Sequence, residues 1–132
     1  MSATPRAPGP EDGRSFPARF GGPAFRYSLS EALETLRVSD RPARNGHRQT
    51  TTFHRDGLTQ VVFAFEPDGH LDRHTAPGLV LIQVLEGRFV LHAEETDHDM
   101  TSGDVLILDP GVPHSVRAVE AGAMLLTVRL ER

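Results

Sequence analysis

The 132-residue sequence contains no cysteine and no lysine, and it has a single tyrosine. The absence of cysteine excludes disulfides, thiolate metal sites and cysteine nucleophiles. Because all 14 basic residues are arginine, a Schiff base on a lysine of the protein is excluded as well. No segment approaches the roughly 18 to 20 consecutive apolar residues that a membrane-spanning helix requires.

Signals for export and for binding to polyanions are also lacking. The N-terminal stretch has no apolar centre of the kind found in secretory signals, and it carries Glu11 and Asp12. The net charge is -4 and the arginines are scattered along the chain. This charge pattern gives no basic footprint for nucleic acid or an anionic membrane. We therefore expect a cytoplasmic protein that binds neither.

The chain length of 132 residues is sufficient for one modest hydrophobic core. Residues 1–26 are rich in Pro, Gly, Ala and Arg, which is typical of an extension that does not fold by itself. We divide the chain into this extension and a domain over 27–132. Three aromatic residues leave open that the extension packs on the domain or on a partner: Phe16, Phe20 and Phe25.

One short amphipathic helix is predicted at 29–37. Ser28 and Glu31 have the spacing of a capping box. The apolar positions at helical spacing are Leu29, Leu33 and Leu36.

Beyond Asn45-Gly46 the sequence consists of short runs rich in Thr, Val, Phe, Ile and Leu, separated by Gly, Pro and Asp turns. Many short strands with almost no helix among them predict an antiparallel β-sandwich or barrel. The runs expected to be strands are 48–54, 58–66, 70–74, 79–86, 88–93, 98–101, 104–108, 114–119 and 123–130.

The strand at 79–85 is apolar on both alternating faces apart from Gln83. A strand of this kind is covered on both sides, whereas a small barrel fills only its inner side. A second copy of the chain would cover the other side, and we therefore expect a homodimer. With Val80, Ile82 and Val84 facing inward, Gln83 faces outward toward that partner unless a bulge reverses the strand.

Two stretches resemble the conserved motifs of the cupin superfamily, in particular its small single-domain cupin 2 type. They are GHLDRHTAPGLVLIQVLEGRFVL, from Gly69 to Leu91, and GDVLILDPGVPHSV, from Gly103 to Val116. The resemblance extends over about residues 60–130. It implies an all-β fold, an antiparallel double-stranded β-helix or jelly-roll barrel, with the short helix preceding it. Members of this family often hold a metal inside the barrel.

The resemblance also implies a ligand set. The second histidine of the first motif falls on His74, and the histidine of the second motif falls on His114. The first histidine of the family falls on Asp72 and its glutamate on Val80. The implied metal ligands are thus His74, His114 and Asp72, a set suited to iron, manganese, nickel or zinc. The departures from the family pattern leave a metal-free barrel open as the alternative.

Strand geometry places residues two apart on one face, about 7 Å from each other, which favours Asp72 and His74 acting together. His70 has the same parity but lies roughly 13 Å from His74 along an extended chain. We take His70, Gln83 and Arg48 as candidates for the pocket lining. Arg48 would hold a carboxylate there, or would belong to an ordinary solvated strand.

Two functions remain open after these observations. One is a metal-dependent oxygenase or isomerase acting on a small organic acid, phenol or carbonyl compound. The other is a metal-free barrel that binds or senses a small molecule without catalysis, so the sequence does not decide whether the protein is an enzyme. The remaining histidines have no paired spacing and are expected at surface or turn positions: His47, His54, His92 and His98.

Overall fold

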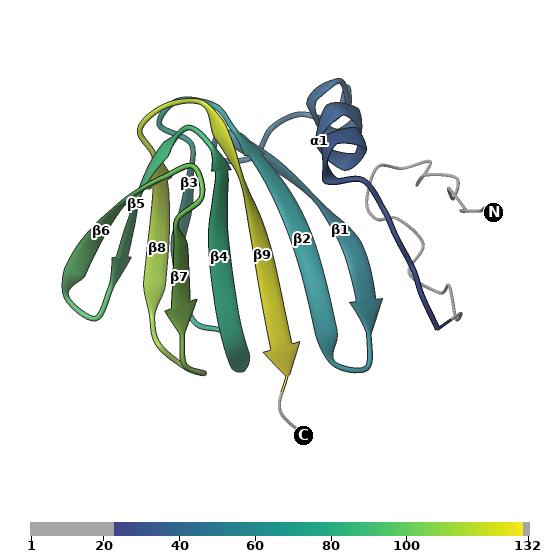
Figure 1. Ribbon diagram of the computed structural model, residues 1–132. Helices are drawn as coiled ribbons and strands as arrows, with labels where there is room; N and C mark the ends of the chain where they lie inside the picture. The colour runs from purple at the N-terminus through teal and green to yellow at the C-terminus, as the bar shows by residue number, and fades with distance from the viewer. Residues whose placement is uncertain (1–22, 131–132) are drawn as a thin grey trace.

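The computed structural model describes residues 23–130, which form one helix and nine strands (Figure 1). Every predicted element is present, with ends that differ by at most two residues. The elements are α1 (Leu29–Arg37), β1 (His47–Arg55), β2 (Leu58–Phe65), β3 (His70–His74), β4 (Gly78–Glu86), β5 (Arg88–Ala93), β6 (Thr96–Thr101), β7 (Val105–Leu108), β8 (His114–Ala118) and β9 (Gly122–Leu130).

The strands form two antiparallel sheets that face each other. Sheet A has the order β1-β2-β9-β4-β7, and sheet B has the order β3-β8-β5-β6. In Figure 1, β5, β6 and β8 of sheet B lie to the left of β4 and β9 of sheet A, and β3 lies behind β7. The chain crosses repeatedly between the two sheets. Strands that are neighbours in space but distant in sequence, such as β2 and β9, give the jelly-roll architecture that the motifs imply.

Helix α1 begins where the sequence predicts. The Ser28 side chain accepts a hydrogen bond from the Glu31 N–H at 3.1 Å and caps the first turn. The buried face of the helix packs on the outer surface of sheet A, where it covers Val62 and Ala123. The helix therefore supports the sheet from outside and contributes no residue to the space between the sheets.

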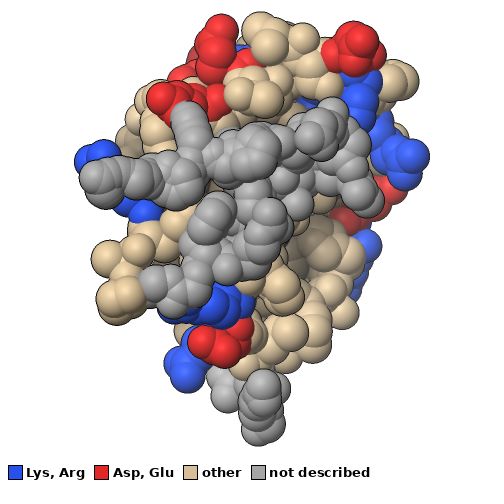
Figure 2. Space-filling model, turned by 90° about the vertical axis from the view of Figure 1, so that its right-hand side faces the viewer, with Lys and Arg blue, Asp and Glu red and all other residues tan. Residues whose placement is uncertain are grey.

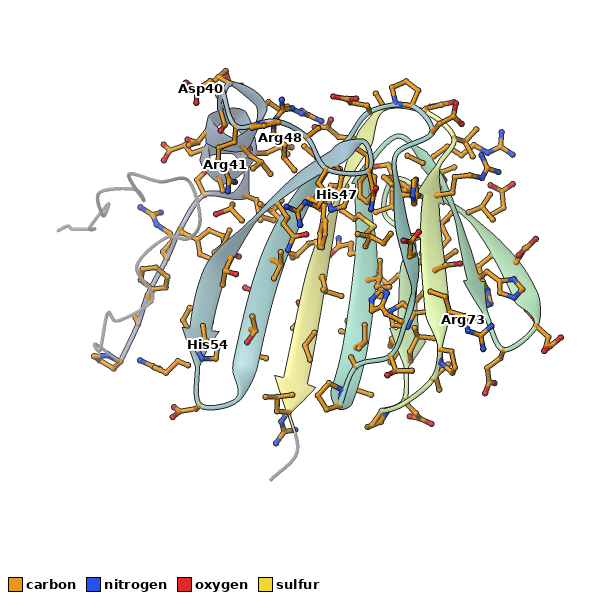
Figure 3. All side chains as sticks on the ribbon, turned by 180° about the vertical axis from the view of Figure 1, so that it is seen from behind. Asp40, Arg41, His47, Arg48, His54 and Arg73 are labelled. Carbon is orange, nitrogen blue, oxygen red and sulfur yellow. The ribbon has the colours of Figure 1, made fainter. Side chains whose placement is uncertain are left out.

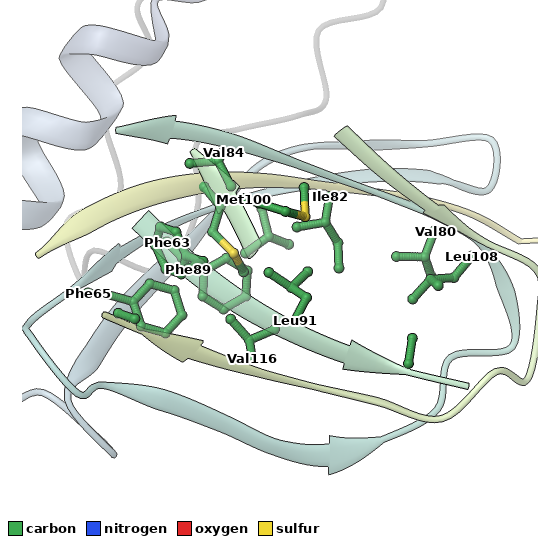
Figure 4. Packing of buried hydrophobic residues seen from close by; sticks show 14 residues of the cluster. Phe63, Phe65, Val80, Ile82, Val84, Phe89, Leu91, Met100, Leu108 and Val116 are labelled. Carbon is green, nitrogen blue, oxygen red and sulfur yellow. The ribbon is translucent and has the colours of Figure 1, made fainter. Parts of the chain in front are cut away.

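The core between the sheets consists of alternate residues of each strand. Aromatic rings of Phe63, Phe65 and Phe89 gather at one end of this core, while Val80 and Leu108 lie at the other (Figure 4). We call the first the aromatic end. Ring centroids of Phe65 and Phe89 are 5.1 Å apart in an edge-to-face arrangement, so the two sheets interlock here.

Two glycines hold the start of β1 against the start of β3 at the aromatic end. A Cβ on Gly69 would lie 2.2 Å from the Gly46 carbonyl oxygen, a distance that no larger residue tolerates. The close approach allows the His70 N–H to donate to the Asn45 carbonyl oxygen at 2.9 Å. One end of the barrel is thereby closed by backbone contacts.

Charged side chains lie on the outer surfaces, where arginine and acidic groups are interspersed on the face shown in Figure 2. The Arg37–Glu86 pair, at 2.7 Å, is one such contact. Among residues 23–130, no helix is long and apolar enough to span a membrane.

Candidate functional site

The structure brings together two histidines that are 40 positions apart in the sequence. His74 ends β3 and His114 begins β8, and the antiparallel register places them directly opposite each other. Their ring centroids are 4.3 Å apart with the planes inclined by 58°. His114 is buried, whereas His74 is exposed. In the pairing of β5 with β8, Phe89 lies opposite Ala118 at one end, and Ala93 lies opposite His114 at the other. The two imidazoles therefore lie at the end of the core that is opposite to Phe89. We call it the histidine end.

Backbone carbonyls fix the same tautomer in both rings. His74 Nδ1 lies 2.7 Å from the Asp72 carbonyl oxygen, and His114 Nδ1 lies 3.0 Å from the Val112 carbonyl oxygen. A carbonyl oxygen only accepts hydrogen bonds, so each Nδ1 carries the proton and donates it. The Nε2 atom of each neutral ring therefore keeps its lone pair. Backbone carbonyls that accept from one ring nitrogen orient metal-binding imidazoles in the same way.

The protonation of His114 follows from its position. Burial is the largest cause and lowers the pKa of His114 below its usual value, because the charged ring loses its hydration. The hydrogen bond to the Val112 carbonyl acts in the opposite direction, and the neighbouring His74 lowers the pKa further. At neutral pH, His114 is thus held in the neutral form that can bind a metal or accept a proton.

Asp72 is not brought together with these rings. Leu71 pairs with Val116 and His74 with His114, so three steps along β3 correspond to two along β8. This irregularity breaks the strict alternation on which the expected shared face of Asp72 and His74 was based. The Asp72 carboxylate lies instead 3.4 Å from His70 Nε2 and is largely exposed. Within the described part of the chain, no group of three His, Asp or Glu side chains suits a metal ion.

The three expected pocket residues lie on outer surfaces. His70 pairs with exposed Arg117 and contacts Asp72. Arg48 lies beside Arg41, and its Nε donates to the Arg41 carbonyl oxygen at 2.8 Å (Figure 3). It therefore fastens the segment after α1.

Gln83 faces outward, as the alternation of β4 predicts. Its neighbours Ile82 and Val84 are buried in the core, and the register places it between Val105 of β7 and Leu125 of β9. The amide thus belongs to the outer surface of sheet A.

Two of the other histidines depart from the expected surface position. His98 is partly buried, and the register pairs it with Leu91 of the core, so it lies on the inner face of sheet B. His47 is only 7% exposed, and its ring packs against those of Phe63 and Phe65, with centroids 5.7 and 5.3 Å away. The expectation of a surface or turn position for His47 is wrong because β1 begins with an inward residue opposite Phe65. The only signal in the sequence is its place at the start of a strand that pairs with an aromatic one.

His92 lies 2.6 Å from the Asp97 carboxylate on the outer side of sheet B and is exposed. His54 is also exposed and contacts the Thr59 hydroxyl. These two histidines occupy the surface positions that were expected.

Residues 61–129, which include almost all of β2 to β9, match the family model described as "Cupin domain". The chain belongs to the cupin superfamily. No curated protein matches this cupin. The family assignment agrees with the jelly-roll topology and with the positions of His74 and His114 within the two motifs.

Solved structures support the same fold. A conserved protein of unknown function from Streptococcus pyogenes is 26% identical, with a TM-score of 0.62 over 67% of this cupin and 78% of that chain. An RmlC-like cupin from Shewanella frigidimarina is 20% identical, with a TM-score of 0.63 over 67% and 80% of the two chains. A "predicted oxalate decarboxylase" from Thermotoga maritima is 18% identical, with a TM-score of 0.61 over 64% and 81%.

Val80 occupies the position where the resemblance expects a glutamate. It lies in the core of the cupin, and only 2% of its surface is exposed. The inner surface of β4 therefore supplies no carboxylate at this point.

Proposed function

We propose that this cupin binds a divalent transition metal at the histidine end, through Nε2 of His74 and of His114, and that a small organic molecule binds beside it. The observation that supports the proposal most directly is the pair of imidazoles at 4.3 Å, each with Nδ1 held by a backbone carbonyl. Imidazole nitrogens suit iron, manganese, nickel and zinc. With two protein ligands, several coordination positions remain for water or the small molecule.

When bound, such a metal supplies Lewis-acid chemistry, polarising a carbonyl or phenolic oxygen as an oxygenase or isomerase requires. The chain itself orients the ligand atoms. The Val112 and Asp72 carbonyls keep both Nε2 lone pairs available, and the burial that lowers the pKa of His114 favours its neutral form.

The test is the metal content of protein purified without chelator or nickel resin, together with thermal shifts on adding manganese, iron, nickel, copper or zinc. Replacing His74→Ala or His114→Ala removes one of two protein ligands. We expect metal stoichiometry to collapse in both variants. The rise in melting temperature on adding metal should disappear with it, since that rise follows from affinity for the folded state.

His92→Ala is the matched control, because it removes an exposed imidazole that already contacts a carboxylate. It should bind as much metal as the wild type. Asp72→Ala decides whether that carboxylate turns inward when metal binds: unchanged stoichiometry would limit the protein ligands to the two histidines. A wild-type protein without bound metal and without any thermal shift would refute the metal centre.

A metal-free barrel that binds or senses a small molecule is the second candidate. It is favoured by the absence, within residues 23–130, of a third metal-binding side chain near the pair and by Val80 in place of a glutamate. In this case the Nε2 lone pairs would accept hydrogen bonds from the ligand. Ligand binding that is equal with and without metal would favour this candidate.

We also propose that two copies associate through the outer surface of sheet A. Ile107 is 60% exposed and Val105 is 48% exposed on β7, and the register continues this apolar strip to Leu81 and Leu125. Gln83 lies within the strip, and an amide can both donate to and accept from its own copy across a two-fold axis. Light scattering should give twice the 14.5 kDa chain mass. A monomer at micromolar concentration would contradict this.

A further inference from the structure

The imidazole pair is surrounded by apolar side chains on its own sheet. In the register, His114 pairs with Ala93 of β5, and the next inward pair along the strands is Leu71 with Val116. Ala93 and Val116 are almost completely buried, and Leu71 packs against the core. On β5 and β8, the inner surface beside the imidazoles therefore offers no hydrogen-bonding side chain other than His114, and His74 faces it from β3. The outermost strand, β6, adds Thr96 opposite Ala93 and His98 opposite Leu91 on the same face.

The facing sheet continues this apolar surface. Val80 and Leu108 lie at the same end of the core (Figure 4). Leu126 and Val128 of β9 face inward and pack against the core but are only partly buried, as is Val112 in the loop before His114. Inward side chains that keep some exposure must border solvent, so this inner surface is accessible at the histidine end.

The polar side chains on the inner surface of the described strands are uncharged at neutral pH or are histidines. On β1 and β2 they include Gln49, Thr51 and Thr59, which the register places on the same face as Val61. On β6 they are Thr96 and His98, which the register places opposite Ala93 and Leu91. Within residues 23–130, no Asp, Glu or Arg that pairs with a residue of a neighbouring strand lies on the inner surface. Arg73 lies in the irregularity of β3, has no assigned partner there and is exposed.

Resting on the proposed function, we infer that the small molecule has one polar head, which meets the imidazole pair, and an apolar body, which lies on these aliphatic side chains. A second carboxylate or a phosphate would lose its hydration here without a cation to pair with, and that loss is costly. Sugars would meet few donors and acceptors beyond the imidazole pair and those on β1, β2 and β6. The ligand class is therefore a phenol or carbonyl compound with a hydrocarbon body, and dicarboxylates such as oxalate are disfavoured.

The experiment uses 4-alkylphenols of increasing chain length as probes, measured by titration calorimetry against zinc-treated and against chelator-treated full-length protein. A phenolic oxygen can bind a metal or donate a hydrogen bond to an imidazole, so the series reports in either case. We expect the affinity to rise about threefold to fourfold per added methylene, as burial of apolar surface predicts. Oxalate should bind more weakly than 4-ethylphenol.

Two matched variants locate the binding surface. Val112→Thr keeps the side-chain volume and the carbonyl that orients His114 but adds a hydroxyl at the histidine end, so the gain per methylene should shrink. Ile107→Thr makes a comparable change on the exposed outer strip and should leave the gain unchanged. If the increase in affinity per methylene is lost in Ile107→Thr and kept in Val112→Thr, the inference is overturned.

Two further outcomes separate this inference from the metal centre. The protein could bind zinc but show equal affinities along the phenol series. It could also bind zinc and bind oxalate tightly in a way that disappears in Arg73→Ala. Either result would overturn the apolar ligand class and leave the metal centre intact. Absence of zinc together with a chain-length dependence that Val112→Thr weakens would refute the metal centre and support the ligand class.

Discussion

The two ends of this cupin barrel are built from the same strands but differ in how they are closed. At the aromatic end, Phe65 and Phe89 of opposite sheets are almost completely buried in edge-to-face contact. At the histidine end, His114 is buried beside exposed His74, and neighbouring aliphatic residues such as Val128 keep part of their surface accessible. The large buried rings are thus concentrated at one end, and partly exposed inward side chains are concentrated at the other.

Backbone geometry reinforces this difference. Gly46 and Gly69 allow β1 and β3 to touch at the aromatic end. Towards the other end, the register of β3 against β8 shifts between Leu71 and His74. An irregularity of this kind re-aims a side chain without changing the strand order. It is the feature that brings His74 opposite His114 although Leu71 also faces inward.

The largest effect of a single change is expected at the aromatic end. Phe89 is fully buried, and Phe89→Ala would remove its ring and leave a cavity, at a cost of about 3–5 kcal/mol in the free energy of unfolding. Denaturant unfolding measures the loss. In the fraction that remains folded, metal binding at the histidine end should be unchanged.

Phe53→Ala is the matched control for this change. Phe53 is a partly exposed residue of β1 that stacks on Phe25, with ring centroids 5.8 Å apart, and it lies outside the core. Its loss should cost clearly less than that of Phe89. Equal costs for the two variants would mean that the aromatic end does not dominate stability.

Most of the fold was predictable from the sequence because it depends on local signals. The capping pair Ser28 and Glu31 defined the helix, and alternating apolar residues between Gly, Pro and Asp turns defined the strands. The inward set of β4, including Val80 and Ile82, and the outward position of Gln83 followed from strand alternation.

The site was predictable only in part. The motifs identified His74 and His114, but the position of Asp72 depends on an irregularity that alternation cannot reveal. Arg48 could not be placed either, since its partner is the Arg41 carbonyl, and the sequence contains no signal for that loop contact. His47 escaped notice because nothing local marks the first residue of an edge strand as buried.

The smallest predicted effect lies at the histidine end and concerns pH in metal-free, chelator-treated protein. Burial lowers the pKa of His114 from its ordinary 6.5, so the unfolded chain binds a proton at this residue at a higher pH than the native protein does. Above 6.5 both states are neutral and the residue contributes nothing. Between 6.5 and the lower native pKa the unfolded state binds more protons, and the free energy of unfolding therefore decreases as the pH falls.

His114→Asn removes this contribution. Its free energy of unfolding should decrease less between pH 7.5 and pH 5.5 than that of the wild type, as measured by denaturant unfolding at the two pH values. His92→Asn is the control, because His92 is exposed and contacts Asp97 outside the barrel. This variant should not show the smaller decrease in the free energy of unfolding that is expected for His114→Asn. If His114→Asn and the wild type lose the same stability on acidification, His114 does not have a depressed pKa in the native barrel. The histidine end would then be as well hydrated as an outer surface, in contrast to the dry aromatic end.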